Sequence, residues 1–134
     1  MSQEKIQIIR GAFEAFQGRG AEPAFAFLAP DVEWKVRPDL PDAGIYEGHD
    51  GVRKLLSRFT DVMEDMWFRP EEFIQVNEEE FVVPVRWGGR GKGSGLDFEE
   101  SRETWMFVVR DSKIVRVKEF ATREQALEAA GLRE

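Results

Sequence analysis

The 134-residue chain has no cysteine and a single histidine, His49. The lack of cysteine excludes disulfide bridges, a thiol nucleophile and zinc sites built on thiolates. One histidine excludes a multi-histidine metal site from one chain, and we expect no metal and no cofactor. Positive charge is also scarce, with 19 basic against 26 acidic side chains and a net charge of −7. Because nucleic-acid binding needs a concentrated positive field, this balance argues against a nucleic-acid partner.

Long apolar runs are missing as well. No stretch approaches the roughly 20 residues of a membrane span, and the first residues lack the features of a signal peptide. We therefore expect no membrane association and a cytoplasmic location. The chain does have 11 Phe, 4 Trp and 1 Tyr, and aromatic residues are what disordered chains lack. Its length suits a single domain over residues 1–134.

Apolar residues spaced three and four apart predict the helices. The first helix ends at Gly18, and a short second helix begins near Pro23. A third helix runs from about residue 48 to Met66. The closing helix begins at Thr122, which forms a capping box with Gln125.

Alternation of apolar and polar residues predicts the strands. They cover residues 32–37, 68–76, 81–87, 96–109 and 114–120. The segment 38–44 is predicted to be a loop, because it is rich in proline, aspartate and glycine. Two helices, a strand, a helix, four strands and a short helix predict an α+β fold, with helices on one face of a mostly antiparallel sheet.

Several segments resemble the SnoaL-like family of the nuclear transport factor two-like superfamily. These segments are residues 30–34, 38–52, 89–95 and 124–132. The resemblance covers essentially the whole chain. It implies a curved sheet wrapped around helices, forming a cone with an apolar pocket, and dimerisation through the outer face of the sheet. Family members include polyketide cyclases, ketosteroid isomerase, epoxide hydrolases, dehydratases and pocketed proteins without known activity.

The aromatic residues predict the nature of the pocket. If a curved sheet encloses a cavity, apolar side chains at every second position must line its concave face. Three tryptophans share this face, and flat rings form good walls for an apolar or aromatic small molecule. The alternative is that these side chains merely fill a core. The predicted ligand-binding residues are Phe13, Phe16, Trp34, Val36, Phe59, Met63, Val85, Trp87, Trp105, Phe107 and Val117.

Glu119 is the leading candidate for chemistry. It shares a strand face with Val115 and Val117, where burial would raise its pKa and make it a proton donor or acceptor near neutral pH. The alternatives are that Phe120 is buried instead, or that Glu119 pairs with a buried arginine. Glu103 could partner Glu119, but we expect it to pair with arginines in a solvated ladder.

His49 and Tyr46 are the predicted catalytic helpers. Histidine is the side chain most often used as a base near neutral pH, and His49 stands at the start of the third helix, where it could act as one. Its alternative role is a structural hydrogen bond to a loop carbonyl. The Tyr46 hydroxyl could donate to a ligand carbonyl, or the side chain could line the pocket without chemistry.

The resemblance leaves the activity open. Ketosteroid isomerase needs an inward aspartate, a tyrosine and a protonated aspartate. At the matching places this chain has Val36, Phe13 or Phe16, and Trp105, which argues against that mechanism. We interpret the chain as a ligand-binding protein of undefined activity. The alternative is an acid–base enzyme of the cyclase, dehydratase, isomerase or epoxide hydrolase type that uses an inward carboxylate.

The outer face of the sheet is predicted to be apolar. Val82, Pro84, Met106 and Val108 alternate with the inward residues of their strands. A monomer would leave these side chains bare, and exposed apolar patches mark interaction sites. We therefore expect a homodimer through the outer face of the sheet.

Overall fold

The computed structural model describes residues 2–16, 22–41, 43–61, 63–91, 93 and 97–131. In chain order its elements are α1 (Ser2–Phe16), the 3₁₀ helix η1 (Glu22–Phe27), β1 (Leu28–Val36), β2 (Gly44–Glu47), α2 (Gly48–Thr60), β3 (Met63–Pro70), β4 (Ile74–Gln75), β5 (Glu80–Gly91), β6 (Asp97–Arg110), β7 (Lys113–Phe120) and α3 (Arg123–Ala129).

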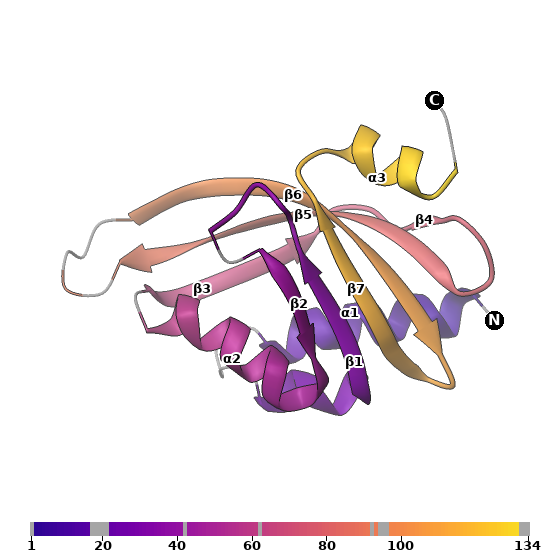
Figure 1. Cartoon of the computed structure of the whole chain (residues 1–134), viewed down its shortest axis with the longest axis horizontal. Coiled ribbons are helices and arrows are strands. Elements are labelled where there is room, and N and C mark those ends of the chain that lie inside the picture. The colour runs from indigo at the N-terminus through magenta and orange to yellow at the C-terminus, as the bar shows by residue number, and fades with distance from the viewer. Residues whose placement is uncertain are drawn as a thin grey trace.

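The described strands form one curved, unclosed sheet. Their order is β2-β1-β7-β6-β5-β3, with β4 paired to β5. Strands β1 and β7 pair in parallel, and the other described pairs are antiparallel. Figure 1 shows α1 and α2 on one side of the sheet and α3 on the other. The predicted α+β fold with a curved, mostly antiparallel sheet is confirmed. The expectation that the helices lie on one face is wrong for α3, which packs on the other face (Figure 1).

The predicted end of the third helix, at Met66, is wrong. Helix α2 ends at Thr60, and both Met63 and Met66 belong to strand β3. Apolar spacing alone continued the helical stripe through these methionines. Strand β3 instead pairs with β5, with an irregularity between Glu64 and Trp67 next to the positive φ of Asp65. This irregularity hides the strand in the sequence because it interrupts the two-residue period.

Two short strands were also missed or merged. Strand β2, which pairs Tyr46 with Trp34 on β1, falls where only a loop and a helix start were predicted. The predicted strand 68–76 is divided into β3, which ends at Pro70, and the two-residue β4. Both errors concern short strands that exist because a neighbouring strand offers hydrogen bonds, so local sequence carries little signal for them.

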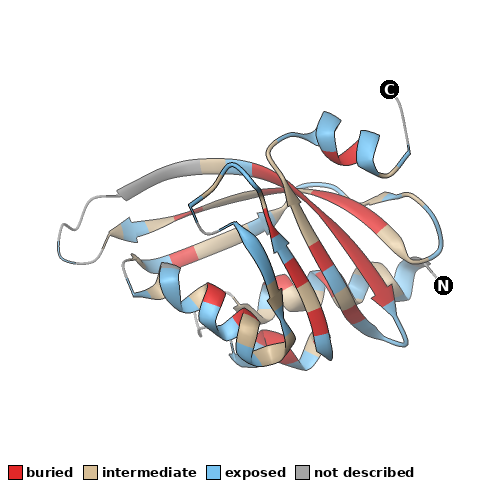
Figure 2. Cartoon of the chain, in the orientation of Figure 1, coloured by how far each residue is buried: buried red, intermediate tan, exposed pale blue. Residues whose placement is uncertain are grey.

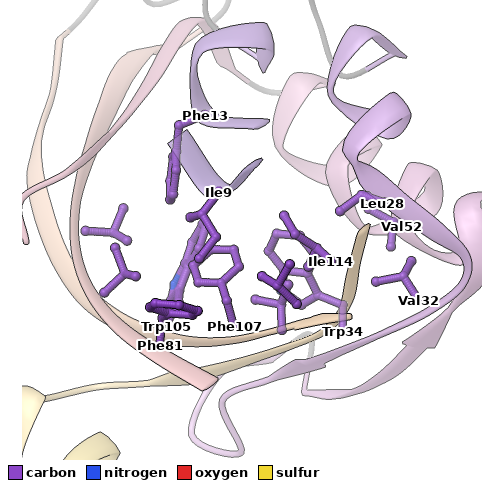
Figure 3. Close-up of a cluster of buried hydrophobic side chains, with 14 of the residues drawn as sticks. Ile9, Phe13, Leu28, Val32, Trp34, Val52, Phe81, Trp105, Phe107 and Ile114 are labelled. Carbon is purple, nitrogen blue, oxygen red and sulfur yellow. The ribbon is translucent and has the colours of Figure 1, made fainter. Parts of the chain in front are cut away.

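The main core lies between the helices and the concave face of the sheet. Figure 3 shows Phe13 reaching from the helical side toward Trp105 and Phe107 on the sheet. Burying one such side chain stabilises the fold by about 1.5–3 kcal/mol. Figure 2 shows buried positions following the strands between these layers. Fully or nearly fully buried members of this core include Ile9, Val32, Val52, Leu55, Phe81, Val83, Val85, Val109, Ile114 and Val117.

Helix α3 begins with the predicted cap. The Thr122 hydroxyl accepts a hydrogen bond from the Gln125 backbone N–H at 3.2 Å. The Gln125 side chain in turn accepts one from the Ala121 N–H at 3.1 Å. These reciprocal bonds satisfy backbone donors that the helix start would otherwise leave unpaired.

This helix changes the argument for a dimer. Ala126 and Leu127 pack on Val82 and Met106, which are buried within the single chain. Val108 is buried too, and only Pro84 is half-buried. The expectation that these four residues form a bare surface was therefore wrong, because α3 covers much of that face. The homodimer itself stays a prediction, and sedimentation at micromolar concentration checks it.

Candidate functional site

Two carboxylates lie side by side on the concave face of the sheet. Alternation along β6 places Glu103 on the same face as Trp105, and pairing of β6 with β7 sets Trp105 opposite Glu119. Glu103 is only 9 % exposed, and the charge of Glu103 acts directly on Glu119. The expectation that Glu103 belongs to a solvated ladder was wrong. The alternative, in which Glu103 acts on Glu119, agrees with the effect of the Glu103 charge on the pKa of Glu119.

A register shift in β7 decides which of its residues point inward. The shift lies between Val108 and Val109 on the β6 side. It places Ile114 and Val117 in the core, whereas Val115 is only half-buried. Val115 was expected on this face because strict alternation ignores such a bulge.

Indole groups hold both carboxylates in place. The Trp34 Nε1–H donates to Glu119 Oε2 at 2.7 Å. The Nε1–H groups of Trp87 and Trp105 donate to the two oxygens of Glu103 at 2.9 and 3.0 Å. Indole is a donor only and a carboxylate is a strong acceptor, so each pair is well matched. These contacts set the orientation of both acids.

Arg37 stands at the edge of this acid pair. Its guanidinium binds Asp39 through two contacts, of 3.1 and 2.6 Å, while its Nη1 lies 3.9 Å from Glu103 Oε2. Its positive charge also acts on Glu119. Alternation predicted Arg37 on the wet face of a strand. Strand β1 ends at Val36, however, and a turn closed by the Leu40 N–H on the Arg37 carbonyl oxygen redirects the side chain.

The surroundings of Glu119 make it titratable near neutral pH. Burial and, second, the negative charge of Glu103 raise the pKa of Glu119 to about 7. The hydrogen bond from Trp34 and the positive charge of Arg37 oppose this rise. A carboxyl with this pKa is protonated in about half of the molecules at pH 7 and can both donate and accept a proton.

The acid pair borders a cavity of about 460 Å³, which we call the acid compartment. Most of its lining residues are apolar, and four of these carry aromatic rings. Its lining consists of Trp34, Val36, Arg37, Leu40, Pro41, Leu55, Leu56, Phe68, Trp87, Ser101, Arg102, Glu103, Trp105 and Glu119.

A smaller cavity of about 60 Å³ adjoins it, which we call the apolar compartment. Both compartments share Trp34, Leu56, Phe68 and Trp105 as lining residues. The other residues of the apolar compartment are Ala12, Phe13, Phe16, Ala24, Phe25, Leu28, Val52, Phe107 and Ile114.

Most predicted pocket residues line one of these compartments. Those that do are Phe13, Phe16, Trp34, Val36, Trp87, Trp105 and Phe107. Three others belong to neither lining: Val85 and Val117 are fully buried in the core, and Met63 lies on β3 near Gly89. The side chain of Phe59 lies outside the described part of the structure.

The structure does not bring His49 or Tyr46 to the acid pair. The His49 Nε2–H donates to the Leu28 carbonyl at 3.0 Å, and the imidazole packs 5.3 Å from the Phe25 ring. Tyr46 is half-buried on β2, with the Arg58 guanidinium 5.8 Å from its ring. Neither residue belongs to the lining of either compartment.

Sequence reasoning misjudged one part of the site, Glu103, and missed two others. Glu103 carried a usable signal, since it alternates with Trp105 and Phe107. Arg37 carried none, because its direction follows from a turn. The loop residues Leu40 and Pro41 also close the acid compartment, and only the return of the chain over the sheet places them there.

The described residues do not form a cluster of metal-ligating side chains. Among the residues that the structure describes, no three or more His, Asp or Glu side chains are grouped to hold a metal ion. Within that same part of the chain, no helix is both long and apolar enough to cross a membrane.

Comparison with known proteins agrees with this architecture. The SnoaL-like domain family matches residues 9–117, whereas no curated protein matches the chain. An NTF2-like protein from Burkholderia xenovorans is 31 % identical, with a TM-score of 0.69 and 96 % and 95 % of the two chains covered. TerC, co-crystallised with polyporic acid, is 22 % identical, with a TM-score of 0.75 and 96 % and 98 % covered. A putative polyketide cyclase from Xanthomonas campestris is 19 % identical, with a TM-score of 0.68 and 96 % and 97 % covered. The protein therefore belongs to the SnoaL-like domain family.

Proposed function

We propose that this protein binds a small, largely apolar molecule with a carbonyl or epoxide oxygen, and that Glu119 exchanges a proton with it. The observation that carries the proposal is the Glu103–Glu119 pair on the wall of an aromatic cavity. Burying two acids side by side is costly for a fold, and such pairs with a perturbed pKa gather at functional sites.

The walls of the acid compartment support the binding step. Trp34 and Trp105 meet edge to face with ring centroids 5.3 Å apart, and Phe68 stacks with Trp87 at 5.9 Å. Such rings suit a flat apolar molecule. Relatives in fold are consistent with this ligand class, since TerC was co-crystallised with polyporic acid and another neighbour is named a putative polyketide cyclase.

The two acids differ in how they can meet a ligand. Both Glu103 oxygens already accept an indole hydrogen bond, whereas only one oxygen of Glu119 does. Glu119 is therefore the better placed proton carrier. As a carboxylate it would take a proton from the carbon next to a carbonyl. The C–H electron pair then forms the enolate, and the new Glu119 acid returns a proton. General acid–base catalysis of this kind contributes about 10²–10⁴-fold in rate.

Deuterium exchange tests this chemistry without knowledge of the natural substrate. We use 2-tetralone as the probe in D₂O and follow loss of its α-proton signal by NMR, with binding measured by tryptophan fluorescence. The wild type should accelerate exchange. Glu119→Gln should abolish the acceleration and keep the affinity, because glutamine retains an acceptor for Trp34. Glu79→Gln, at a half-buried carboxylate that lines neither compartment, serves as the control. Exchange at the wild-type rate in Glu119→Gln would remove Glu119 from the mechanism.

A second candidate function is binding without turnover. It is favoured by the distance of the expected helpers, since His49 is held by the Leu28 carbonyl and Tyr46 lines neither compartment. In that case the wild type binds 2-tetralone, Trp105→Ala weakens the binding, and neither protein accelerates exchange.

A further inference from the structure

The wall between the two compartments has a polar edge and an apolar face. Trp34 and Trp105 belong to both linings. Their indole N–H groups reach the acids, at 2.7 Å from Glu119 and 3.0 Å from Glu103. Their ring carbons contribute to the lining of the apolar compartment. One pair of side chains thus presents hydrogen-bonded acids to one cavity and hydrocarbon to the other.

From this arrangement we infer that the ligand is amphipathic. Its oxygen-bearing head occupies the acid compartment. A short unbranched apolar tail extends from the head past Trp34 and Trp105, which line both cavities, into the apolar compartment. The head rests on the proposed function. The tail rests on a separate cavity and on different residues, so the two parts can fail independently.

The apolar compartment suits hydrocarbon and nothing charged. All of its lining side chains are apolar except for the indole N–H groups of its tryptophans, which are already bonded to the acids. The Phe13 ring stacks on Trp105 at 5.9 Å and packs edge-on against Phe107 at 5.8 Å, so this end is walled by rings. A polar head placed here would lose its hydrogen bonds to water without replacement.

The volume limits the length of the tail. A cavity needs about 10–15 Å³ to hold one water molecule, so this compartment suits a tail of roughly four carbon atoms. Its volume is about 60 Å³. Each methylene that enters should tighten binding about fourfold until the space is full.

Two alanines keep this space open. Ala12 lies on α1 and Ala24, which is buried, lies on η1, and both contribute to the lining. A larger side chain at either position would occupy the volume that the tail requires. We therefore assign Ala12 and Ala24 as the residues that determine tail length.

The test is a series of 4-alkylacetophenones, from acetophenone to the 4-hexyl compound, titrated against the whole chain by tryptophan fluorescence and calorimetry. In the wild type, affinity should rise about fourfold per carbon up to roughly the butyl compound and then stop rising or fall. Ala24→Leu should bind acetophenone like the wild type and lose the gain from longer tails. Ala12→Leu, on a different helix, repeats the test if Ala24→Leu does not fold. Ala129→Leu, which adds the same atoms at an exposed position of α3, is the matched control.

The outcomes separate the two proposals. The tail site is overturned if affinity does not depend on tail length. It is also overturned if affinity rises equally in the wild type and both filled variants, because the tail then gains affinity only by leaving water and not by entering the apolar compartment. A length limit that shortens in the filled variants supports it. Suppose that the length limit shortens in the filled variants but Glu119→Gln leaves deuterium exchange unchanged. The proposed proton transfer then fails, and the tail site stands.

Discussion

Strands β5 and β6 place apolar side chains on both of their faces, but a cavity borders the concave face and a helix packs directly on the outer face. On the concave face, Glu103 and Trp105 border a cavity of about 460 Å³. On the outer face, Val82 and Met106 pack directly against Leu127 of α3. Both faces are largely buried, so burial alone does not distinguish a pocket from a core.

What differs is the element that covers each face. Helix α3 is short and places Ala126 and Leu127 flush against the sheet. On the other side, α1 and α2 lie over the concave face (Figure 1). There, Ala12 and Ala24 and several aromatic rings line the apolar compartment. A short helix can lie directly on the outer face of these strands, whereas elements that span the concave face leave space where their side chains are small.

The largest expected effect is on the concave side, from Trp105→Ala. Trp105 is buried and its ring contacts Phe13, Trp34 and Phe68. Its removal should lower the free energy of unfolding by about 3–5 kcal/mol, measured by urea denaturation. The matched control is Trp67→Ala on β3, a half-buried tryptophan that packs over Gly88 and Arg69. It should cost at most about 2 kcal/mol. If both variants lose the same free energy of unfolding, Trp105 on the concave face is no more tightly packed than the half-buried Trp67.

The next effect is a pH dependence that belongs to the concave face alone. The pKa of Glu119 rises from 4.5 to about 7 on folding, so the folded state binds this proton more tightly. The resulting stabilisation is complete below pH 4.5 and is lost as pH rises toward 7, by at most about 3 kcal/mol. Glu119→Gln should flatten this part of the stability curve and be more stable than the wild type at pH 8.

A control for this pH dependence comes from Glu79, which lies outside both compartments. The hydrogen bond from Arg110 lowers the pKa of Glu79, so its contribution disappears as pH falls through its folded pKa. Glu79→Gln should therefore keep the wild-type slope between pH 4.5 and 7. Denaturation curves across pH decide between these outcomes. An unchanged slope in Glu119→Gln would contradict the burial of an acid at this position.

A smaller effect is expected on the outer face, from Leu127→Ala. This side chain is buried against Val82 and Met106. We expect a loss of about 2 kcal/mol, at the low end for such a change, because a short helix can settle into the void. Affinity for 2-tetralone should stay at the wild-type value. A weaker affinity would show that the two faces are coupled.

The smallest effect is expected at the edge of the acid pair, from Asp39→Asn. Asp39 is exposed and holds the Arg37 guanidinium through two contacts. An asparagine weakens this hold and lets the positive charge approach Glu103 and Glu119. The pKa of Glu119, measured by carbon NMR, should fall below its wild-type value, with little change in stability, since exposed ion pairs contribute little. A higher pKa would contradict the placement of Arg37.

Local patterns predicted the long elements well and the short ones badly. The alternation of Trp105 and Phe107 placed β6, and Thr122 with Gln125 placed the start of α3. Strand β2 and the end of α2 were missed, because a four-residue strand and a helix end depend on partners far away in sequence. The same reason explains Arg37, whose side chain is aimed by the end of β1 and the turn that follows.

The amino-acid sequence by itself determined the class of fold, an inward face rich in tryptophan and an acid at position 119 on the last strand. Alternation and helical spacing are local properties, and local properties decide which side chains share a face. Only the tertiary structure decided that Glu103 joins Glu119 and that α3 covers the outer residues. It also divided the space inside the fold into two compartments. These features depend on the register between strands and on the curvature of the sheet, which arise from contacts between segments far apart in the chain.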